Sequence, residues 1–209
     1  MTPVVVIGGG GHAKVVIDAA RAAKLQVLGF LAKDLAPDST LLGATCLGDD
    51  DAFFARFAPG DVFVAHGVGM VRTSGVRREI FERYKRRGYT FVSVVHPRSV
   101  VAEEVAIGEG TVVMAGAILQ PGVTLHENVI VNTSASVDHD CVIGAHTHVA
   151  PGATISGGVS IGAGSFIGAG AVVRQGSRIG ANCLVGAGAV VVRDVGDGEE
   201  VVGIPARQK

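Results

Sequence analysis

The chain has 209 residues, of which 48% are hydrophobic and 18% are charged, and its formal net charge is −1. This near-neutral balance gives no electrostatic reason to bind nucleic acid or an anionic membrane surface. The first residues lack a basic segment followed by an apolar one, and no apolar run is long enough to span a bilayer, so we expect neither secretion nor membrane insertion. The three cysteines are far apart (Cys46, Cys141 and Cys183), which argues against disulfides and favours a cytoplasmic location.

Amino-acid composition changes near residue 95. Seven of the eight phenylalanines and both tyrosines precede this point, and the count of Lys plus Arg falls from 12 before it to 6 after it. We therefore expect two domains, 1–94 and 95–209.

The first domain alternates strand-like and helical segments. It opens with a buried apolar strand, a run of four glycines and an amphipathic helix. Further strand-like segments lie at 26–31, 61–67 and 89–95, and helical patterns lie at 49–57 and 71–87. This alternation predicts a Rossmann-like α/β domain with a parallel sheet in three layers. The many Lys and Arg residues of 71–87 are interpreted as a solvated helix face.

The glycine run is a candidate phosphate-binding turn. Gly8, Gly10 and Ala13 fit the G-x-G-x-x-G/A pattern, whose backbone N–H groups bind phosphate at a helix N-terminus. A domain of 94 residues is short for a full dinucleotide fold, so a mononucleotide or nucleotide sugar fits better. A tight turn without a ligand is the alternative, although four successive glycines exceed what a turn requires.

The second domain is a six-residue repeat without insertions. All seventeen residues met in steps of six from Val95 to Val191 are Val, Ile or Leu. All seventeen residues four positions after them, from Ser99 to Val195, are Ala, Val, Ser, Thr or Cys. A fixed short period predicts a parallel β-helix in which one bulky and one small residue of each hexad point inward.

Three hexads make one triangular coil of 18 residues, so residue n stacks on residue n+18 at about 4.8 Å. Cys141 and Cys183 take the small inward position and are expected to be buried. We expect the glycines that follow several bulky residues to provide unusual backbone dihedrals at corners. These glycines are Gly108, Gly144, Gly162, Gly168, Gly180 and Gly186.

The repeat resembles that of the hexapeptide acyltransferases, and this resemblance, rather than the period, implies a left-handed β-helix. The two domains together resemble bacterial nucleotide-sugar acetyltransferases: the sialic acid O-acetyltransferase-like group and the N-acetyltransferases of 4-amino sugars, including the GDP-perosamine N-acetyltransferases. The resemblance covers the whole chain. It rests on "GGGGHAKVV", "NTSASVDHDCVIGAHTHVAPGA" and "VVGIPAR".

The resemblance assigns roles to polar residues of the middle segment. His139 corresponds to the general base of the family, and Asp140 to the acid that supports it. His148 corresponds to the histidine that contacts acyl-CoA, and the Gly157 N–H, one coil from His139, is placed to face the thioester oxygen. Asn132 is a candidate substrate contact.

Three histidines of this segment, at 139, 146 and 148, occupy outward or corner positions of the repeat, so none is expected in the β-helix core. We interpret His146 as solvated surface.

Two further sets of residues are expected to bind ligands. The nucleotide sugar is expected at the glycine turn and after the later strands, at Gly10, Gly11, His12, Lys33, Asp34 and Gly67. The resemblance implies acetyl-CoA as co-substrate, held along the β-helix and its closing tail at Ala169, Ala187, Ile204 and Pro205.

Relatives that bind UDP-sugars carry two acids after the second strand, where this chain has Ala32 and Lys33 followed by Asp34. This departure puts uridine recognition in doubt and favours GDP-perosamine, with a UDP-sugar still possible. The sequence does not separate N-acetylation from O-acetylation of the sugar.

Two other function classes remain open. Some hexapeptide β-helices are zinc carbonic anhydrases with three histidine ligands, and the three histidines between 139 and 148 supply enough imidazoles. That reading leaves the glycine turn and the closing tail without a role, so we expect no metal. A non-catalytic nucleotide-sugar sensor built on a trimeric scaffold is the second alternative.

The spacing of His139 and His148 predicts how the chains assemble. Nine residues are half of an 18-residue coil, so the two side chains are expected on opposite sides of the prism. If both act on one acetyl group, they come from neighbouring chains, and the resemblance implies a homotrimer with three such sites.

Overall fold

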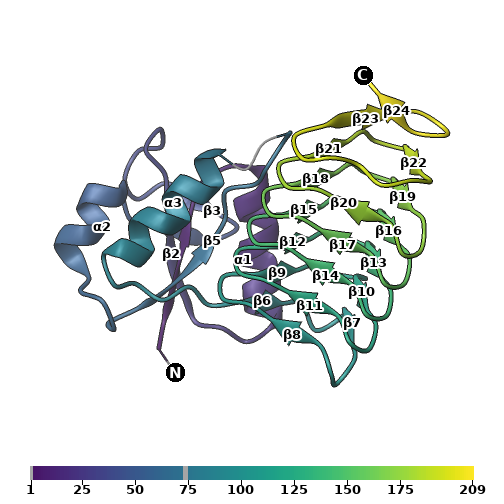
Figure 1. The fold of residues 1–209 in the computed structure, drawn as a ribbon. Coiled ribbons are helices and arrows are strands. Elements are labelled where there is room, and N and C mark those ends of the chain that lie inside the picture. The colour runs from purple at the N-terminus through teal and green to yellow at the C-terminus, as the bar shows by residue number, and fades with distance from the viewer. Residues whose placement is uncertain (1, 73–74) are drawn as a thin grey trace.

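The computed structural model describes residues 2–72 and 75–209, which form a sheet-and-helix unit and a long stack of short strands (Figure 1). The N-terminal sheet has the strand order β3-β4-β2-β1-β5, with β3 antiparallel to β4 and the other strands parallel. Its elements are β1 (Val4–Ile7), α1 (Gly11–Ala22), β2 (Val27–Leu31), β3 (Thr40–Leu41), β4 (Ala44–Cys46), α2 (Asp50–Arg56), β5 (Phe63–His66) and α3 (Gly75–Arg86).

Helix α1 lies between the sheet and the strand stack, whereas α2 and α3 cover the other face of the sheet (Figure 1). Val16 on the buried face of α1 shares an apolar core with Val112 and Ile130 of the stack. Phe53 and Tyr84, from α2 and α3, pack in a separate core against the sheet. The three layers expected of the α/β domain are therefore confirmed, and the middle core joins the two units.

Three details of the N-terminal unit and its boundary differ from the expectation. Segment 89–95 is not a strand of this sheet: only Phe91 bridges to Val64, while Val94–Val95 forms β6, the first strand of the stack. The apolar run divides because Phe91 fills the core under α3 and Val94 fills the core under α1. The division placed between residues 94 and 95 falls inside β6. The β3–β4 hairpin was missed, because two- and three-residue strands carry little alternation to detect.

The stack is a triangular prism in which every strand from β6 to β22 begins six residues after the previous one. Strands pair in parallel with those 18 residues away, as Leu119 does with Val137. The first face holds β6 (Val94–Val95), β9 (Val112–Val113), β12 (Ile130–Val131), β15 (His148–Val149), β18 (Phe166–Ile167) and β21 (Leu184–Val185). The second face holds β7 (Val100–Val101), β10 (Ile118–Leu119), β13 (Ser136–Val137), β16 (Thr154–Ile155), β19 (Val172–Val173) and β22 (Val190–Val191). The third face holds β8 (Ala106–Ile107), β11 (Thr124–Leu125), β14 (Val142–Ile143), β17 (Ser160–Ile161) and β20 (Arg178–Ile179).

No loop interrupts this register, so the prediction of a continuous β-helix is confirmed, and the parallel stacks are consistent with left-handed winding. The bulky and small inward residues form one core along the prism, with Cys141 and Cys183 buried in it as expected. The closing tail adds β23 (Glu200–Val202) and β24 (Arg207–Gln208) to the first face. Among the described residues, no helix is long and apolar enough to cross a membrane.

The glycines that follow the bulky residues serve a different purpose from the one expected. A Cβ on Gly162 would lie 2.5 Å from the backbone nitrogen of Ala181 in the next coil. Such glycines are therefore required by the close approach of successive coils. The positive φ angles fall two residues later, as at Gly164 with φ of 72°.

Candidate active site

The prism has three edges, and the N-terminal unit covers one face and one edge. The first face packs on α1. The edge between the third and first faces, called the helix edge here, contacts α3. The edge between the first and second faces, the open edge, includes turns 132–135, 168–171 and 186–189. The edge between the second and third faces, the far edge, includes turns 138–141 and 156–159 and lies opposite the covered face.

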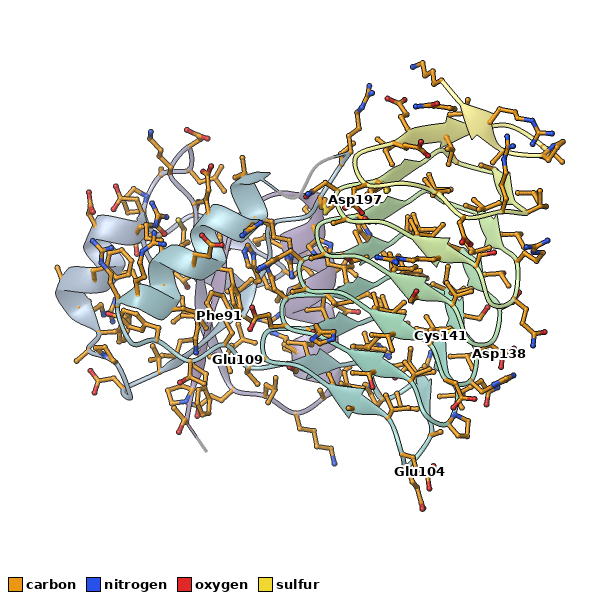
Figure 2. All side chains as sticks on the ribbon, viewed as in Figure 1. Phe91, Glu104, Glu109, Asp138, Cys141 and Asp197 are labelled. Atoms are coloured by element: carbon orange, nitrogen blue, oxygen red, sulfur yellow. The ribbon has the colours of Figure 1, made fainter. Side chains whose placement is uncertain are left out.

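His139 lies on the far edge with an exposed side chain. Its Nδ1 is 2.9 Å from a carboxylate oxygen of Asp140, and its backbone N–H donates to Asp138. The hydrogen bond to Asp140 is the main cause that raises the pKa of His139 above its usual value. Figure 2 shows Asp138 and Cys141, which flank this pair, on the side of the β-helix away from the N-terminal unit.

The His139 ring lies directly over Gly157 of the next coil. A Cβ on Gly157 would be 2.4 Å from Nε2 of His139, so only glycine leaves room for the ring. Asp140 has φ of 59°, a left-handed conformation that Gly122 and Gly158 take at the equivalent turns. Aspartate and asparagine adopt this conformation more readily than most residues, and Asn128 and Asn182 do so at the corresponding turns of the helix edge.

His148 lies on the first face, covered by the N-terminal unit, and is only 6% exposed. Its Nδ1 donates to the Met70 carbonyl at 3.0 Å, which leaves Nε2 to accept from the Asn132 amide at 3.0 Å. Burial is the main cause that lowers the pKa of His148 to about 4. Both ring nitrogens are engaged within the chain, and a contact between His148 and acyl-CoA stays a prediction.

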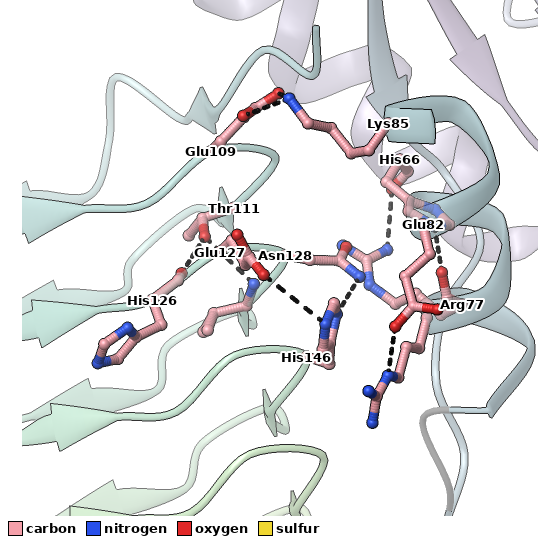
Figure 3. Close-up of polar contacts among 12 residues, drawn as sticks. His66, Arg77, Glu82, Lys85, Glu109, Thr111, His126, Glu127, Asn128 and His146 are labelled. Atoms are coloured by element: carbon pink, nitrogen blue, oxygen red, sulfur yellow. Dashed lines mark hydrogen bonds and ion pairs between the residues drawn. The ribbon is translucent and has the colours of Figure 1, made fainter. Parts of the chain in front are cut away.

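The interpretation of His146 as solvated surface was wrong. His146 lies on the helix edge, is 6% exposed, and meets the Phe81 ring edge-on at 5.6 Å between centroids. Its Nδ1 accepts from the Asn128 amide at 2.9 Å, and Glu127 lies nearby (Figure 3). The repeat indicated that this ring points away from the β-helix core, but not that α3 covers it.

The three histidines of the zinc alternative do not converge. His139 lies on the far edge, His146 on the helix edge and His148 on the first face. Within residues 2–72 and 75–209, no group of three or more His, Cys, Asp or Glu residues is placed to hold a metal ion. One chain therefore offers no three-histidine zinc site among its described residues.

A cavity of about 720 Å³ adjoins the glycine turn at the carboxyl ends of β1 and β2. Gly10, Lys33 and Asp34 line it, as predicted for nucleotide binding. A Cβ on Gly10 or on Gly11 would meet no atom within 4 Å, so the backbone there is open to a ligand.

The cavity also has walls that were not predicted from the sequence, among them residues 49–51 and Arg83. Arg83 pairs with Asp50, which also accepts from the Tyr84 hydroxyl. The sequence carried little signal for 49–51, because they follow β4, a strand too short to detect, although loops after parallel strands do line the ligand crevice of such sheets.

Three predicted nucleotide-binding residues, Gly11, His12 and Gly67, do not line this cavity. A Cβ on Gly67 would lie 2.8 Å from the Ile7 carbonyl oxygen, so this glycine is required by packing. His12 is largely buried, and burial, followed by the charge of Arg77, lowers its pKa to about 3.

The residues predicted to bind acetyl-CoA divide between two edges. Ala169 and Ala187 lie exposed on the open edge, one coil apart, and Ile204 and Pro205 are exposed in the closing tail. Gly157 lies with His139 on the far edge. A single chain therefore does not gather this set at one place.

Comparisons with known proteins cover both units. The family model described as the PglD N-terminal domain matches residues 3–84, and the bacterial transferase hexapeptide model matches residues 122–157 and 158–193. The acetyltransferase domain of PglB from Neisseria gonorrhoeae FA1090 is 36% identical, with a TM-score of 0.92 and 100% of each chain covered. It has also been solved in complex with acetyl coenzyme A.

Two further solved structures are similar over the whole chain. PerB from Caulobacter crescentus, in complex with CoA and GDP-perosamine, is 39% identical, with a TM-score of 0.88 and coverage of 99% of this chain and 97% of that one. WeeI from Acinetobacter baumannii AYE is 29% identical, with a TM-score of 0.88 and 100% of each chain covered. The chain therefore belongs to the PglD-like family of hexapeptide-repeat, acetyl-CoA-dependent sugar N-acetyltransferases.

Proposed function

We propose that this protein transfers the acetyl group of acetyl-CoA to the amino group of a nucleotide-linked 4-amino-4,6-dideoxy sugar, with GDP-perosamine as the favoured substrate. One arrangement carries this proposal: a nucleotide-sized cavity at an open glycine turn and a His139–Asp140 pair on an exposed β-helix edge occur in the same chain. The first holds the nucleotide, and the second removes a proton from the amine.

The preference for guanine rests on the cavity wall and on one relative. Asp34 and Lys33 line the cavity, with Ala32 beside them where UDP-binding relatives have an acid. A carboxylate accepts from the two adjacent N–H donors on the Watson–Crick edge of guanine, which uracil lacks. PerB, which is 39% identical, was solved with GDP-perosamine bound.

In the proposed reaction, the amine attacks the thioester carbonyl, CoA leaves as the thiolate, and His139 takes the proton that the amine loses. Asp140 fixes the ring through Nδ1 and stabilises its charged form. The Gly157 N–H has no hydrogen-bond partner among the described residues and is available to the developing oxyanion.

The acceptor cavity and the base belong to different chains in this proposal. The N-terminal unit covers the first face, whereas His139 lies on the opposite edge of the same chain. A ring of three chains would place the far edge of each beside the open edge of its neighbour. Acetyl-CoA would then lie in the cleft, between Gly157 of one chain and Ala169 and Ala187 of the next.

The test is CoA release in the presence of acetyl-CoA and a panel of GDP-, UDP- and dTDP-linked 4-amino sugars. We expect the highest kcat/KM with GDP-perosamine, and mass spectrometry of the product should show an N-acetyl group. Equal activity on free amino sugars would contradict the role given to the N-terminal unit. A preference for a UDP-sugar would overturn the guanine assignment alone.

A further inference from the structure

The segment after β5, residues 66–70, lies between the nucleotide cavity and the first face of the β-helix. Val68 lines the cavity, while the Met70 carbonyl accepts from Nδ1 of His148. A Cβ on Gly69 would lie 3.2 Å from Cβ of His12, so this segment also closes over that ring. The position of these residues therefore affects both the acceptor cavity and the His148–Asn132 pair.

Arg77 holds this segment from α3. Its guanidinium donates to the carbonyls of His66 at 3.1 Å and Val68 at 2.6 Å. In return, Nε2 of His66 donates to the Arg77 carbonyl at 2.9 Å, and Nδ1 of His66 accepts from the Val68 N–H at 3.3 Å. The two residues form a reciprocal clamp across the start of the segment, shown with its neighbours in Figure 3.

Arg77 is an unusual residue to find in this place. Its side chain is 1% exposed, and no carboxylate pairs with it among the described residues. Its Nε and Nη2 have no partner within those residues. Burying a cation without a counter-ion is costly, and an apolar residue of similar size would pack here at lower cost. The expectation that the basic residues of 71–87 form a solvated face is wrong for Arg77.

We propose that Arg77, together with His66, is a positioning residue for acetyl transfer: the clamp fixes residues 66–70 so that Val68 shapes the nucleotide cavity while Met70 orients His148 and, through it, Asn132. Neither clamp residue touches substrate in this account. The inference deepens the proposed function and rests on it.

The kinetic test removes the clamp and measures the loss of kcat/KM. The control is a variant of another buried residue on the same helix. Arg77→Met should lower kcat/KM for the nucleotide amino sugar about a hundredfold, because small displacements of positioned groups have effects of this size. Arg77→Lys keeps the charge but not the planar fork and should fall between Arg77→Met and the wild type. Phe81→Leu, on the same helix and 3% exposed, is the control for destabilisation and should stay within about threefold of the wild type. If Arg77→Met folds and its kcat/KM equals that of Phe81→Leu, the proposal is overturned.

If Arg77→Met does not fold, a second pair of variants tests the clamp from the His66 side. His66→Gln keeps a side-chain N–H near the Arg77 carbonyl, and His66→Leu does not. We expect His66→Gln to keep most of the activity and His66→Leu to lose it. Equal kcat/KM for the two, whether high or low, would contradict the clamp.

Nitrogen-15 NMR of the histidine rings gives a readout that needs no substrate. In the wild type, His148 should show a single neutral tautomer protonated at Nδ1, because Met70 accepts from that atom. Arg77→Lys should broaden or mix this signal, whereas Phe81→Leu should leave it unchanged. An unaltered tautomer in Arg77→Lys and Arg77→Met would overturn the link to His148. If the wild type transfers no acetyl group, the proposed function is wrong. The NMR spectrum still tests whether the clamp orients His148, because it needs no substrate.

Discussion

Four of the seven histidines of this chain fall into two chemically different groups. His139 is exposed, and its neighbour Asp140 raises its pKa. His12, His66 and His148 are buried at the junction of the two units, where burial and the charge of Arg77 lower their pKa values. The exposed histidine is suited to take up a proton, whereas the buried ones stay neutral and serve as fixed hydrogen-bonding groups.

Replacing His139, the proposed general base, should slow the chemical step. His139→Ala is expected to lower kcat by about 10²–10⁴-fold, the range typical of general-base loss, with little change in stability because the side chain is exposed. Steady-state kinetics and thermal unfolding check both parts. A loss below about tenfold would mean that the amine binds already neutral, or that the leaving thiolate accepts the proton.

Asp140, the proposed partner of His139, should control the pH dependence of kcat/KM. Asp140 raises the pKa of His139, and the ring acts as a base only above that pKa. In Asp140→Asn the pKa falls toward its usual value, so the acid limb of kcat/KM moves to lower pH while the plateau decreases through loss of orientation. The ionisation of the substrate amine is the same for both proteins and does not produce the difference. An acid limb that stays in place or moves to higher pH would exclude this role for Asp140.

Gly157 offers a test of the base without changing it. A Cβ at this position would lie 2.4 Å from Nε2 of His139, so Gly157→Ala displaces the exposed ring. We expect most activity to be lost with little loss of stability. The control is Gly176→Ala on the same edge, where the added methyl meets open space but φ is 69°. That variant should be destabilised by about 1 kcal/mol and remain active.

At the scale of the elements, glycines between coils set the spacing of the β-helix. A Cβ on Gly162 would lie 2.5 Å from a backbone nitrogen of the next coil, where no flexible side chain can move away. Gly162→Ala should therefore destabilise the protein by about 1–3 kcal/mol, as overpacking does in other cores. Urea unfolding of Gly162→Ala beside the wild type measures this loss. A midpoint equal to that of the wild type would show that coil spacing adapts to the added methyl.

The register of the β-helix was predictable from sequence because a single spacing decides which side chains point inward, whereas its handedness came from the family resemblance and not from the spacing. The same spacing could not reveal contacts with another unit. It placed His146 and His148 outside the β-helix core, but which edge or face the N-terminal unit covers is decided by the packing of α1 and α3. Arg77 was misread for the same reason, since a charged residue gives no sign of burial without its surroundings.

The cavity proposed for the nucleotide was predictable in part. The glycine turn, Lys33 and Asp34 do adjoin one cavity, because they follow strands that end at the same edge of the sheet. His12 follows β1 and Gly67 follows β5, which ends at the same edge of the sheet, yet His12 turns toward the β-helix and Gly67 packs against β1. Position after a strand predicts proximity to the crevice but not the direction of the side chain.

At the scale of the whole molecule, the proposed site combines the far edge of one chain with the covered face of its neighbour, so we expect activity to need two chains. Mixing His139→Ala with His148→Ala subunits should restore activity, because some clefts then combine an intact His139 with an intact His148. Trimers that form at random from equal amounts of the two variants should recover about a quarter of the wild-type activity. Each side of a cleft carries the required variant in half of the cases, so about one cleft in four is complete. Each variant alone is the control. No recovery in verified mixed trimers would place both histidines in the site of one chain.

The unbroken register also constrains how this protein can change length in evolution. Removing one hexad between Gly157 and Ala169 would rotate every later turn by one edge, carrying Ala169 and Ala187 away from the open edge. Removing a full coil of 18 residues would keep every later residue on its own edge and only shorten the prism. The unit of inheritance that keeps every residue on its own edge is therefore the coil of three hexads, although the hexapeptide is the unit visible in the sequence.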